Sequence, residues 1–501
     1  MNSSKNQKIS ENERDRISSL PDSVLVHILS FLPTKDAVQT VLVPPFRHLW
    51  TNVHTLSFDV CSYHDCDSFE SFDDDDSGPT YDKRFLGLMH NVLILHERST
   101  IHEFHLRFHF SLYYSSGESG LEESILQNYV SKERRMASEI SSWIRFAMRK
   151  KVKVLDLDLN GCCYIYETAH YTLPNIVLRS GYLTELKLAA CDIKPLGQIH
   201  LNSLKTLSLQ EVMLSEKTMD EILCGCPLLE NLSLMDCYGF SKLNFTSPNI
   251  KKLMLILRVN EPRLKISCPN LVSLEIAGWI EKADLVNVSS LVEASLWFSY
   301  CFKFACREYR NVKMLLEKLR HSKVFKPCRW CILVLTIWEL TNLPCPSFNW
   351  KCVVLEIPLT KWHLPGLSNL LRNSICLETL TIYIEPVCSF WFQPFQNEGK
   401  WIESYDLDGE NYWNSQEGSF YCLTHNLRTV MLFGSITESY AIQLAEFLLK
   451  SAMVLEKMVI STNESVKPDH QNSLSSDELL EFSRKLLSIP RASTCATIHL
   501  S

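Results

Sequence analysis

The chain has 501 residues, 46% of them hydrophobic, and a formal net charge of −7. That length allows a large buried core, either in several domains or in one long repeat array. The negative charge argues against a nucleic-acid binder that relies on a basic surface. We see neither a signal peptide nor an apolar run of the ~20 residues that span a membrane, so we expect a soluble protein of the cytoplasm or nucleus.

The N-terminal residues 1–13 are polar and aperiodic, which is typical of a disordered tail. Residues 14–60 change to a helical pattern. Pro21 suits the first turn of a helix, because its missing N–H costs nothing there. An amphipathic stripe with steps of three and four residues follows, made by Leu25, Ile28, Leu29 and Leu32.

Prolines divide the rest of this segment. Pro33 stops the first helix, and Thr34 can cap a second one. The Pro44-Pro45 pair ends the second helix, and residues 46–50 can form a third, very short one. Three such helices are a small unit to be stable alone. The surplus apolar side chains either pack on the rest of the chain or bind a partner; they are Val24, Val26 and Phe31.

The order of residues in this segment resembles a known motif. The run L-P-x-x-x-L-x-x-I-L-S-F-L-P-T-K-D-A-V, from Leu20 to Val38, is similar to the F-box of the plant F-box/leucine-rich-repeat family, and so is the ending Arg47-x-Leu49-Trp50. The resemblance implies docking on the small adaptor subunit of a cullin ubiquitin ligase. We assign that contact to Leu20, Pro21, Val24, Leu25, Ile28, Leu29, Phe31, Leu32 and Pro33.

One part of the segment departs from the family pattern. Members usually continue with serine, two basic residues and tryptophan, where this chain has Val43, Pro44, Pro45 and Phe46. Two prolines remove two backbone donors and fix two φ angles. We expect the junction before the third helix to differ locally, which bears on the strength of adaptor docking.

From residue 53 onwards, segments of the form L-x-x-L-x-L recur. Successive matches start at steps of 21, 25, 21 and 21 residues, at Leu183, Leu204, Leu229, Ile250 and Leu271. This is the leucine-rich-repeat period, in which each repeat adds one strand to a curved parallel sheet. Unrelated strands in an ordinary α/β domain do not account for five successive matches. We therefore predict repeats over residues 151–345, with Cys191 and Cys237 at the turns after strands and a backing helix over residues 216–226.

Residues 61–150 are predicted to hold divergent first repeats. Strand patterns begin at Val53 and Ile101, far apart because insertions lie between them. One insertion carries the acidic run at residues 73–76, which is typical of a solvated loop, an acidic docking segment being the alternative. Residues 85–96 and 140–148 have helical spacing.

Residues 346–501 are predicted to hold terminal repeats and a closing unit. Residues 354–359 and 377–382 remain strand-like, and an aromatic, polar loop follows at residues 390–420, with Trp391, Trp401 and Trp413. A strand, a helix and a strand come next, and with the ending Ile489-Pro490-Arg491-Ala492-Ser493 they resemble the FBD region that closes many plant F-box proteins. Because a repeat array must cover its last apolar layer, we expect this βαβ-like unit to be a cap.

The chain contains no motif for phosphate binding, zinc proteolysis or serine hydrolysis. The histidines His96, His102, His105 and His109 alternate with apolar residues, which indicates exposed or lightly packed rings and not a metal or catalytic cluster. The C-x-x-C pair of Cys328 and Cys331, like Cys224 and Cys226, lacks the further ligands of a zinc site. We predict no catalytic residue, no metal and no cofactor.

The overall prediction is an α/β protein with a three-helix F-box, a curved leucine-rich-repeat solenoid and a βαβ-like cap. It would recognise substrates for a cullin ligase without being an enzyme, binding an unidentified target protein and neither nucleic acid nor membrane. Candidate target-binding residues lie between the strand leucines, where side chains point away from the core: Lys187, Ser208, Ser233, Met254 and Glu275.

Other classes of function stay open. One is a leucine-rich-repeat binding protein that no longer joins a ligase, and another is a hydrolase or transferase with an unrecognised site. A variant of the first prediction makes the repeats a small-molecule sensor. In that variant a set of basic side chains lines an anion site, the alternative being an ordinary solvated surface; they are Lys251, Lys252, Arg258, Arg263 and Lys265.

Overall fold

The computed structural model describes most of the chain: residues 17–60, 83–108, 123–160, 171–258, 261–298, 306–385, 405, 407–416, 420–434, 439–461 and 484–500. It divides into two compact units, Met1–Leu229 with Cys237–Gly239, and Glu230–Asp236 with Phe240–Ser501. The expected N-terminal tail and the acidic run at residues 73–76 lie outside the described residues.

The first unit begins with short helices. They are α1 (Asp22–Leu29), α2 (Thr34–Gln39) and the 3-10 turns η1 (Thr40–Leu42), η2 (Pro44–Phe46) and η3 (Leu49–Asn52). Pro21 and Pro33 occupy the N-cap positions of α1 and α2. Thr34 is therefore the first residue of α2 and not its cap, because the ring of Pro33 already fixes the extended φ that a cap position needs.

A parallel sheet follows in the first unit. Its described strands pair in the order β1 (Thr55–Asp59), β2 (Glu103–Arg107), β3 (Val154–Asp158), β5 (Glu185–Ala189) and β7 (Thr206–Gln210). Apolar residues at one register position form a buried row, each at most 2% exposed: Leu56, Phe104, Leu155, Leu186 and Leu207. The spacing of the repeated motif thus places its leucines in one continuous core layer.

Helices and short strands complete the first unit. They are α3 (Lys83–Leu95), α4 (Glu123–Arg149), β4 (Tyr171–Thr172), η5 (Val177–Arg179), β6 (Cys191–Asp192) and α5 (Glu216–Gly225). The predicted helix at residues 216–226 is confirmed as α5, whose N-cap Ser215 accepts a hydrogen bond from the backbone N–H of Thr218 at 3.0 Å. The thiols of Cys191 and Cys237 donate to the carbonyls of Ala189 and Leu209, as expected of turn residues.

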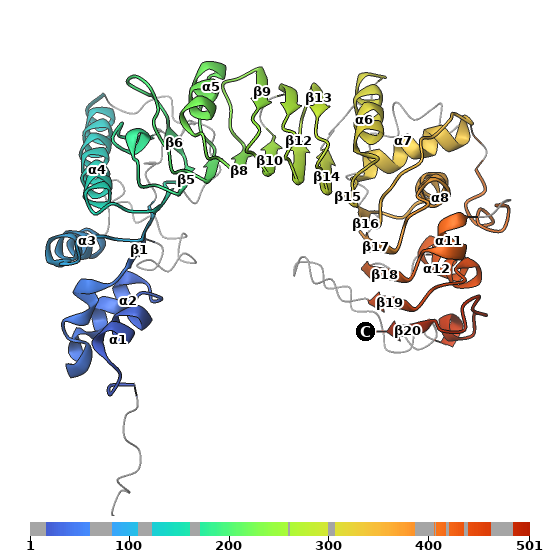
Figure 1. The fold of residues 1–501 in the computed structure, drawn as a ribbon, viewed down its shortest axis with the longest axis horizontal. Helices are drawn as coiled ribbons and strands as arrows, with labels where there is room; N and C mark the ends of the chain where they lie inside the picture. Colours follow the sequence, from blue (N-terminus) through green and yellow to red (C-terminus); the bar gives the residue numbers. More distant parts are fainter. Residues whose placement is uncertain are drawn as a thin grey trace, which may run out of the picture. The chain divides into compact units, whose positions relative to one another are not determined.

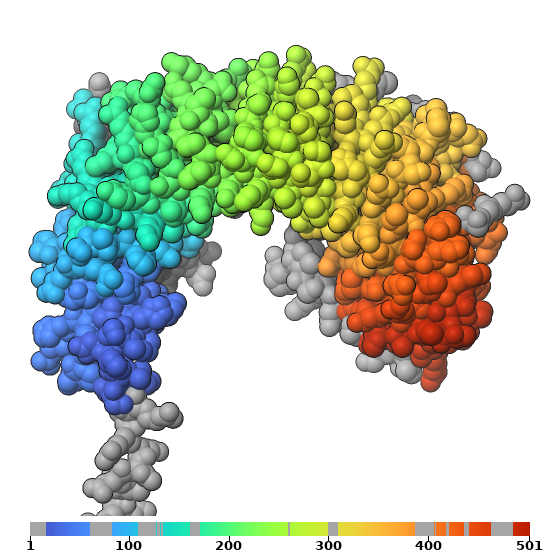
Figure 2. All heavy atoms as spheres, in the orientation of Figure 1, coloured from blue at the N-terminus to red at the C-terminus, as the bar shows by residue number. Residues whose placement is uncertain are grey.

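The second unit continues the same pattern in ten described strands. Their order is β8 (Asn231–Met235), β10 (Lys252–Leu257), β12 (Ser273–Gly278), β14 (Glu293–Phe298), β15 (Val324–Lys326), β16 (Cys352–Ile357), β17 (Thr379–Ile384), β18 (Thr429–Gly434), β19 (Lys457–Ser461) and β20 (Thr497–Leu500). Neighbouring strands in this order are parallel, and Leu232, Leu253 and Leu274 share one register position at 1–2% exposure. Figure 2 shows the consecutive order at the surface, where segments border those next to them in sequence.

The backing elements of the second unit change along the chain. Behind β8, β10 and β12 lies a second parallel sheet of β9 (Lys242–Thr246), β11 (Arg263–Ser267) and β13 (Lys282–Asn287). Later repeats are backed by helices: α6 (Cys306–Leu319), α7 (Arg329–Leu340), η6 (Lys361–His363), α8 (Leu364–Asn373), α11 (Tyr421–His425) and α12 (Ser439–Ser451). In Figure 1, α7 and α8 lie together on one side of the strands β15 to β17.

Gly278 ends β12 in a conformation that other residues rarely adopt. Its φ is +97°, and a Cβ built there would lie 2.1 Å from the carbonyl oxygen of Leu257 on the neighbouring strand. The glycine therefore allows two successive repeats to approach closely.

Candidate protein-binding surfaces

The N-terminal helices form a small packed module. Leu25, Leu29, Ala37 and Trp50 are each at most 7% exposed and form its interior. Two side-chain oxygens fasten the module to the first strand: Ser30 Oγ accepts from the N–H of His54 at 2.9 Å, and Thr34 Oγ1 from that of Ser57 at 2.7 Å. The module is thus fixed on β1.

The outer side of the module is apolar. Its exposed fractions include 75% for Phe31 and 82% for Leu42. Of the residues predicted to contact an adaptor, seven are exposed: Leu20, Pro21, Val24, Ile28, Phe31, Leu32 and Pro33. We call these seven the module's apolar face. Exposed contiguous apolar side chains of this kind mark protein-binding surfaces.

Leu25 and Leu29 do not belong to this face. They are 1% and 3% exposed, because their side of α1 packs into the module's interior, whereas Ile28 of the same stripe stays exposed. We therefore reassign them from adaptor contact to holding α1 in place.

The segment that departs from the family pattern forms two tight turns. η1 ends at Leu42, Val43 is extended, and η2 takes in both prolines and Phe46. Val41, Leu42 and Val43 are 37–82% exposed. Val43 of the departing segment and the two residues before it therefore add exposed apolar side chains to the surface of the module.

The second candidate surface is the open face of each sheet, which we define as the strand positions that alternate with the buried row. In the first unit one line of this face runs through Ser57, His105, Asp156, Lys187 and Ser208, which are partners in register. The predicted Lys187 and Ser208 are thus neighbours, and both are half-buried.

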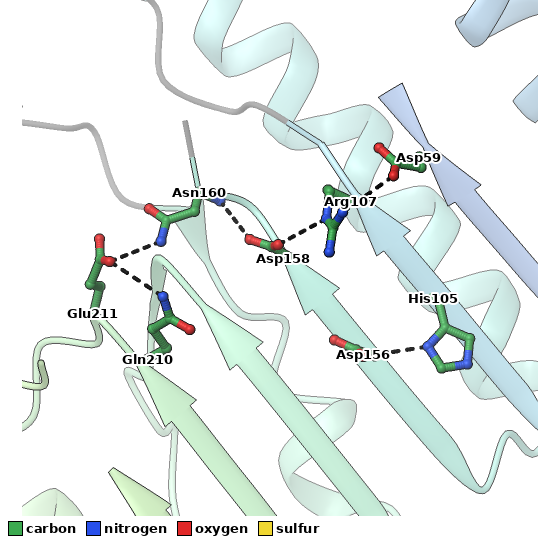
Figure 3. A network of polar contacts seen from close by, with 8 residues as sticks. All are labelled: Asp59, His105, Arg107, Asp156, Asp158, Asn160, Gln210 and Glu211. Carbon is green, nitrogen blue, oxygen red and sulfur yellow. Dashed lines mark hydrogen bonds and ion pairs between the residues drawn. The ribbon is translucent and has the colours of Figure 1, made fainter. Parts of the chain in front are cut away.

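A polar network covers this open face (Figure 3). Arg107 links two strands, with its Nη1 3.4 Å from Asp59 Oδ2 and its Nε 3.1 Å from Asp158 Oδ2. The amide of Asn160 donates to Glu211 Oε1 at 3.0 Å, and that of Gln210 to the same oxygen at 3.4 Å. The network fixes charged side chains across β1, β2 and β3.

His105 lies between two carboxylates on the same face. Its Nδ1 is 3.4 Å from Asp156 Oδ2 and its Nε2 is 3.1 Å from Glu103 Oε2. The hydrogen bond with Asp156 raises the pKa of His105, partial burial opposes the rise, and Glu103 adds to it. From the sequence, His105 is predicted only as an exposed or lightly packed ring. Its position between two carboxylates could not be predicted, because one of them belongs to a repeat some fifty residues later.

His96 differs from that expectation. It is 4% exposed, and its Nε2 lies 3.1 Å from the carbonyl oxygen of Val53. Burial lowers its pKa, partly offset by this hydrogen bond. The ring is buried because the chain after α3 packs against the residues before β1, where the N–H of Glu97 also donates to the carbonyl of Thr51 at 3.0 Å. His109 lies outside the described residues.

The second unit brings together the other predicted target-binding residues. Ser233, Met254 and Glu275 are partners in register on its open face, and all three are half-buried. Farther along, the face becomes aromatic, where the rings of Tyr383 and Phe433 stack with centroids 5.1 Å apart. The spacing of the motif places such residues on the open face, but which two rings stack depends on the register between β17 and β18.

Three of the five basic side chains of the predicted anion site form ion pairs with acids in the structure. Lys251 lies 3.0 Å from Glu230 and Arg263 2.6 Å from Glu281, and Arg258 forms an ion pair with Asp236. The structure therefore favours the interpretation of an ordinary solvated surface.

The aromatic loop is only partly described, and Trp391 and Trp401 lie outside that part. Trp413 is 7% exposed and stacks on Phe447 with ring centroids 4.4 Å apart. A pocket of about 520 Å³ lies beside it, lined by Trp413, Phe420, Phe447 and polar residues of α12. Trp413 is thus part of a packed wall and not of an exposed loop.

Within the described ranges, no three or more His, Cys, Asp or Glu side chains gather closely enough to hold a metal ion. Cys328 and Cys331 are adjacent, but they supply two of the four ligands that a structural zinc site needs. No described helix combines the length and the apolar character required to cross a membrane.

Comparisons with known families match two parts of the chain. The F-box domain model matches residues 17–55, and the model described as "FBD-associated F-box protein At5g56370, LRR repeats" matches residues 140–287. These ranges coincide with the helical module and with strands β3 to β13.

Several proteins of Arabidopsis thaliana are similar over most of their length. The putative F-box/LRR-repeat protein At3g18150 is 28% identical, over 89% of this chain and 86% of its own. The F-box/LRR-repeat protein At5g02910 is 27% identical, over 94% and 92%. The probable F-box protein At1g60180 is 30% identical, over 54% of this chain and 82% of its own.

Proposed function

The chain belongs to the plant F-box/leucine-rich-repeat family, and we propose on this basis that it is the substrate-recognition subunit of an SCF-type cullin ubiquitin ligase. In this role the chain is not an enzyme. It holds a target protein near the ubiquitin-charged conjugating enzyme, and its contribution to the chemistry is the raised effective concentration of a target lysine.

The observation that carries the proposal is the apolar face of the N-terminal module. Seven apolar residues, including Ile28 and Phe31, remain exposed although the module has its own interior. We propose that the adaptor subunit covers this face, because burying each such side chain is worth up to about 1.5–3 kcal/mol. The exposed Val41, Leu42 and Val43 would lie at the edge of the same contact.

We propose that the target binds the open faces of the repeat strands, as defined above for each unit. The five candidate residues Lys187, Ser208, Ser233, Met254 and Glu275 are half-buried there and do not belong to the apolar core. The charged network around Arg107 belongs to this candidate surface in the first unit, and the Tyr383–Phe433 pair belongs to it in the second.

The finer domain limits are part of the proposal. We propose a three-helix F-box at residues 14–60, divergent repeats at 61–150, regular repeats at 151–345 and terminal repeats at 346–501, built as a curved solenoid. The parallel β18–α12–β19 unit followed by β20 supports an FBD-like cap, because these elements cover the last repeats. We also propose a cytoplasmic or nuclear location.

The second candidate function is a repeat protein that no longer joins a ligase. The turns at Val43 and the two prolines favour it, because they replace the usual junction of the motif. The two candidates differ in one observable property, which is the binding of the adaptor subunit.

Two measurements test the proposal. The full chain, expressed with a plant adaptor subunit and cullin and with the proteasome blocked, should co-purify with both. Absence of the adaptor from the purified chain would select the second candidate. For the target, the charge reversals Lys187→Glu and Glu275→Lys should reduce target capture without changing the melting temperature, because both side chains lie outside the core. If both variants capture the target like the wild type, the target site lies elsewhere.

A further inference from the structure

Two cysteines meet at the start of a central helix of the second unit. Cys328 is the N-cap residue of α7, and Cys331 lies in its first turn, where its N–H donates to the carbonyl of Cys328 at 3.0 Å. Both thiols are free, and their sulfur atoms are 3.9 Å apart. The side chains are 4% and 0% exposed.

Other buried thiols of the chain have a different environment. Cys237 donates to the carbonyl of Leu209, Cys268 to that of Phe245, and Cys422 to that of Leu371 at 2.9 Å. Each of these sulfurs is held by a backbone oxygen, as expected of a structural thiol. In the pair at α7, one sulfur is the neighbour of the other.

The surroundings of Cys328 favour its thiolate. Burial opposes the charge, but hydrogen bonds from the Cys331 thiol and from backbone groups of Phe298, Trp330 and Cys331 outweigh it and lower the pKa of Cys328 to about 7. The position at the N-terminus of a helix acts in the same direction. A thiolate near neutral pH is the nucleophile that thiol oxidation requires.

We propose that Cys328 and Cys331 form a reversible disulfide when the protein meets a peroxide. The Cys328 thiolate attacks one peroxide oxygen, which breaks the O–O bond, leaves a sulfenic acid and releases hydroxide. The Cys331 sulfur then attacks the sulfenic sulfur, and the S–O bond breaks. Overall, two thiols and one hydrogen peroxide give one disulfide and two waters. A cellular dithiol restores both thiols by exchange.

The geometry requires only a local change. A disulfide needs the sulfurs at about 2.05 Å, and residues three apart at a helix start already share one turn. The pair also lies close to the ends of β14 and β15, since a backbone group of Phe298 hydrogen-bonds to Cys328. Lys326, two residues earlier on β15, forms an ion pair with Glu293 of β14 at 2.7 Å, and Phe298 ends β14. Oxidation therefore acts on the junction of β14, β15 and α7.

Peptide mapping of the full chain tests the proposal directly, because trypsin cuts after Arg329, between the two cysteines. The purified, reduced protein is treated with hydrogen peroxide, unfolded in the presence of N-ethylmaleimide so that buried thiols are also blocked, and digested without reductant. The expected result is a linked pair of peptides, one ending at Arg329 and one beginning at Trp330, that dithiothreitol separates. Both cysteines should lose their maleimide labelling together.

Three variants sharpen the test. Cys328→Ser and Cys331→Ser should each abolish the linked pair, and Cys331→Ser should leave a sulfenic acid on Cys328 that dimedone traps. Cys422→Ser is the matched control, since it removes a buried thiol held by a carbonyl, and it should leave the linked pair intact. The proposal is overturned if Cys328 and Cys331 stay fully alkylatable after treatment that oxidises the exposed Cys224, or if dimedone labels Cys331 in the Cys328→Ser variant but never Cys328.

Discussion

Replacement of Ile28 by aspartate tests the adaptor surface most directly. Ile28 lies on α1 with 40% of its surface exposed, so the fold keeps more than half of the side chain covered and leaves the rest for a partner. Complete burial of such a side chain contributes about 1.5–3 kcal/mol, and the exposed share therefore contributes about 0.6–1.2 kcal/mol to docking.

The carboxylate adds a larger penalty. An ionised group buried in an apolar contact without a partner costs several kcal/mol. The sum is at least about 3 kcal/mol, which corresponds to a loss of affinity of more than about a hundredfold. We expect Ile28→Asp to lose the adaptor in co-purification and in a direct binding titration.

A matched control separates docking from folding. Ile94 on α3 is 78% exposed and lies outside the module, so Ile94→Asp makes the same chemical change at a site without an expected adaptor contact. It should bind the adaptor like the wild type. Both variants should keep the melting temperature of the repeats. Wild-type affinity of Ile28→Asp for the adaptor would refute the assignment of this surface.

Three further predictions concern stability. Leu253→Ala should lower the free energy of unfolding by about 2–5 kcal/mol in urea titration, since Leu253 is 1% exposed in the buried row, whereas Met254→Ala on the open face should cost far less. Gly278→Ala should destabilise by more than about 1 kcal/mol, because its φ is positive and its Cβ would meet the Leu257 carbonyl, while Gly181→Ala, with open space around it, should be nearly neutral. Burial lowers the pKa of His363 to about 3, so between pH 6.5 and 3 the unfolded chain binds a proton that the folded chain does not. The free energy of unfolding should therefore fall as the pH drops through this window, and His363→Gln should make its pH dependence less steep. An unchanged pH dependence in the variant would contradict the assignment of this effect to His363.

Much of the architecture follows from local sequence. The spacing of the repeated motif alone predicts buried strand residues at its middle leucines, and Leu207, Leu232, Leu253 and Leu274 are each at most 2% exposed in parallel strands. Alternation in a strand sends every second side chain to one face, so the motif by itself also places Lys187 and Glu275 on the other face. The helix α5 followed equally from its spacing, whereas its Ser215 cap is a finding of the structure.

The backing of the repeats did not follow from the leucine spacing. Behind β8, β10 and β12 the chain forms the strands β9, β11 and β13, and behind later repeats it forms helices. Short segments such as residues 263–267 pair only with residues about twenty positions away, so their partners, and hence their secondary structure, are set by the stacking of repeats.

The surfaces needed the tertiary structure for the same reason. The F-box motif predicts the same role, adaptor contact, for Leu25, Ile28 and Leu29. Only the packing of α1 within its module decides that Ile28 is exposed and that the two leucines are buried. The pairing of Arg107 with Asp59 and Asp158, and of His105 with Asp156, joins repeats about fifty residues apart. A single repeat determines which way its own side chains point. The partner of each side chain depends on the neighbouring strand. Because insertions of variable length separate the repeats, the local sequence does not show which residue of the next repeat will be that partner.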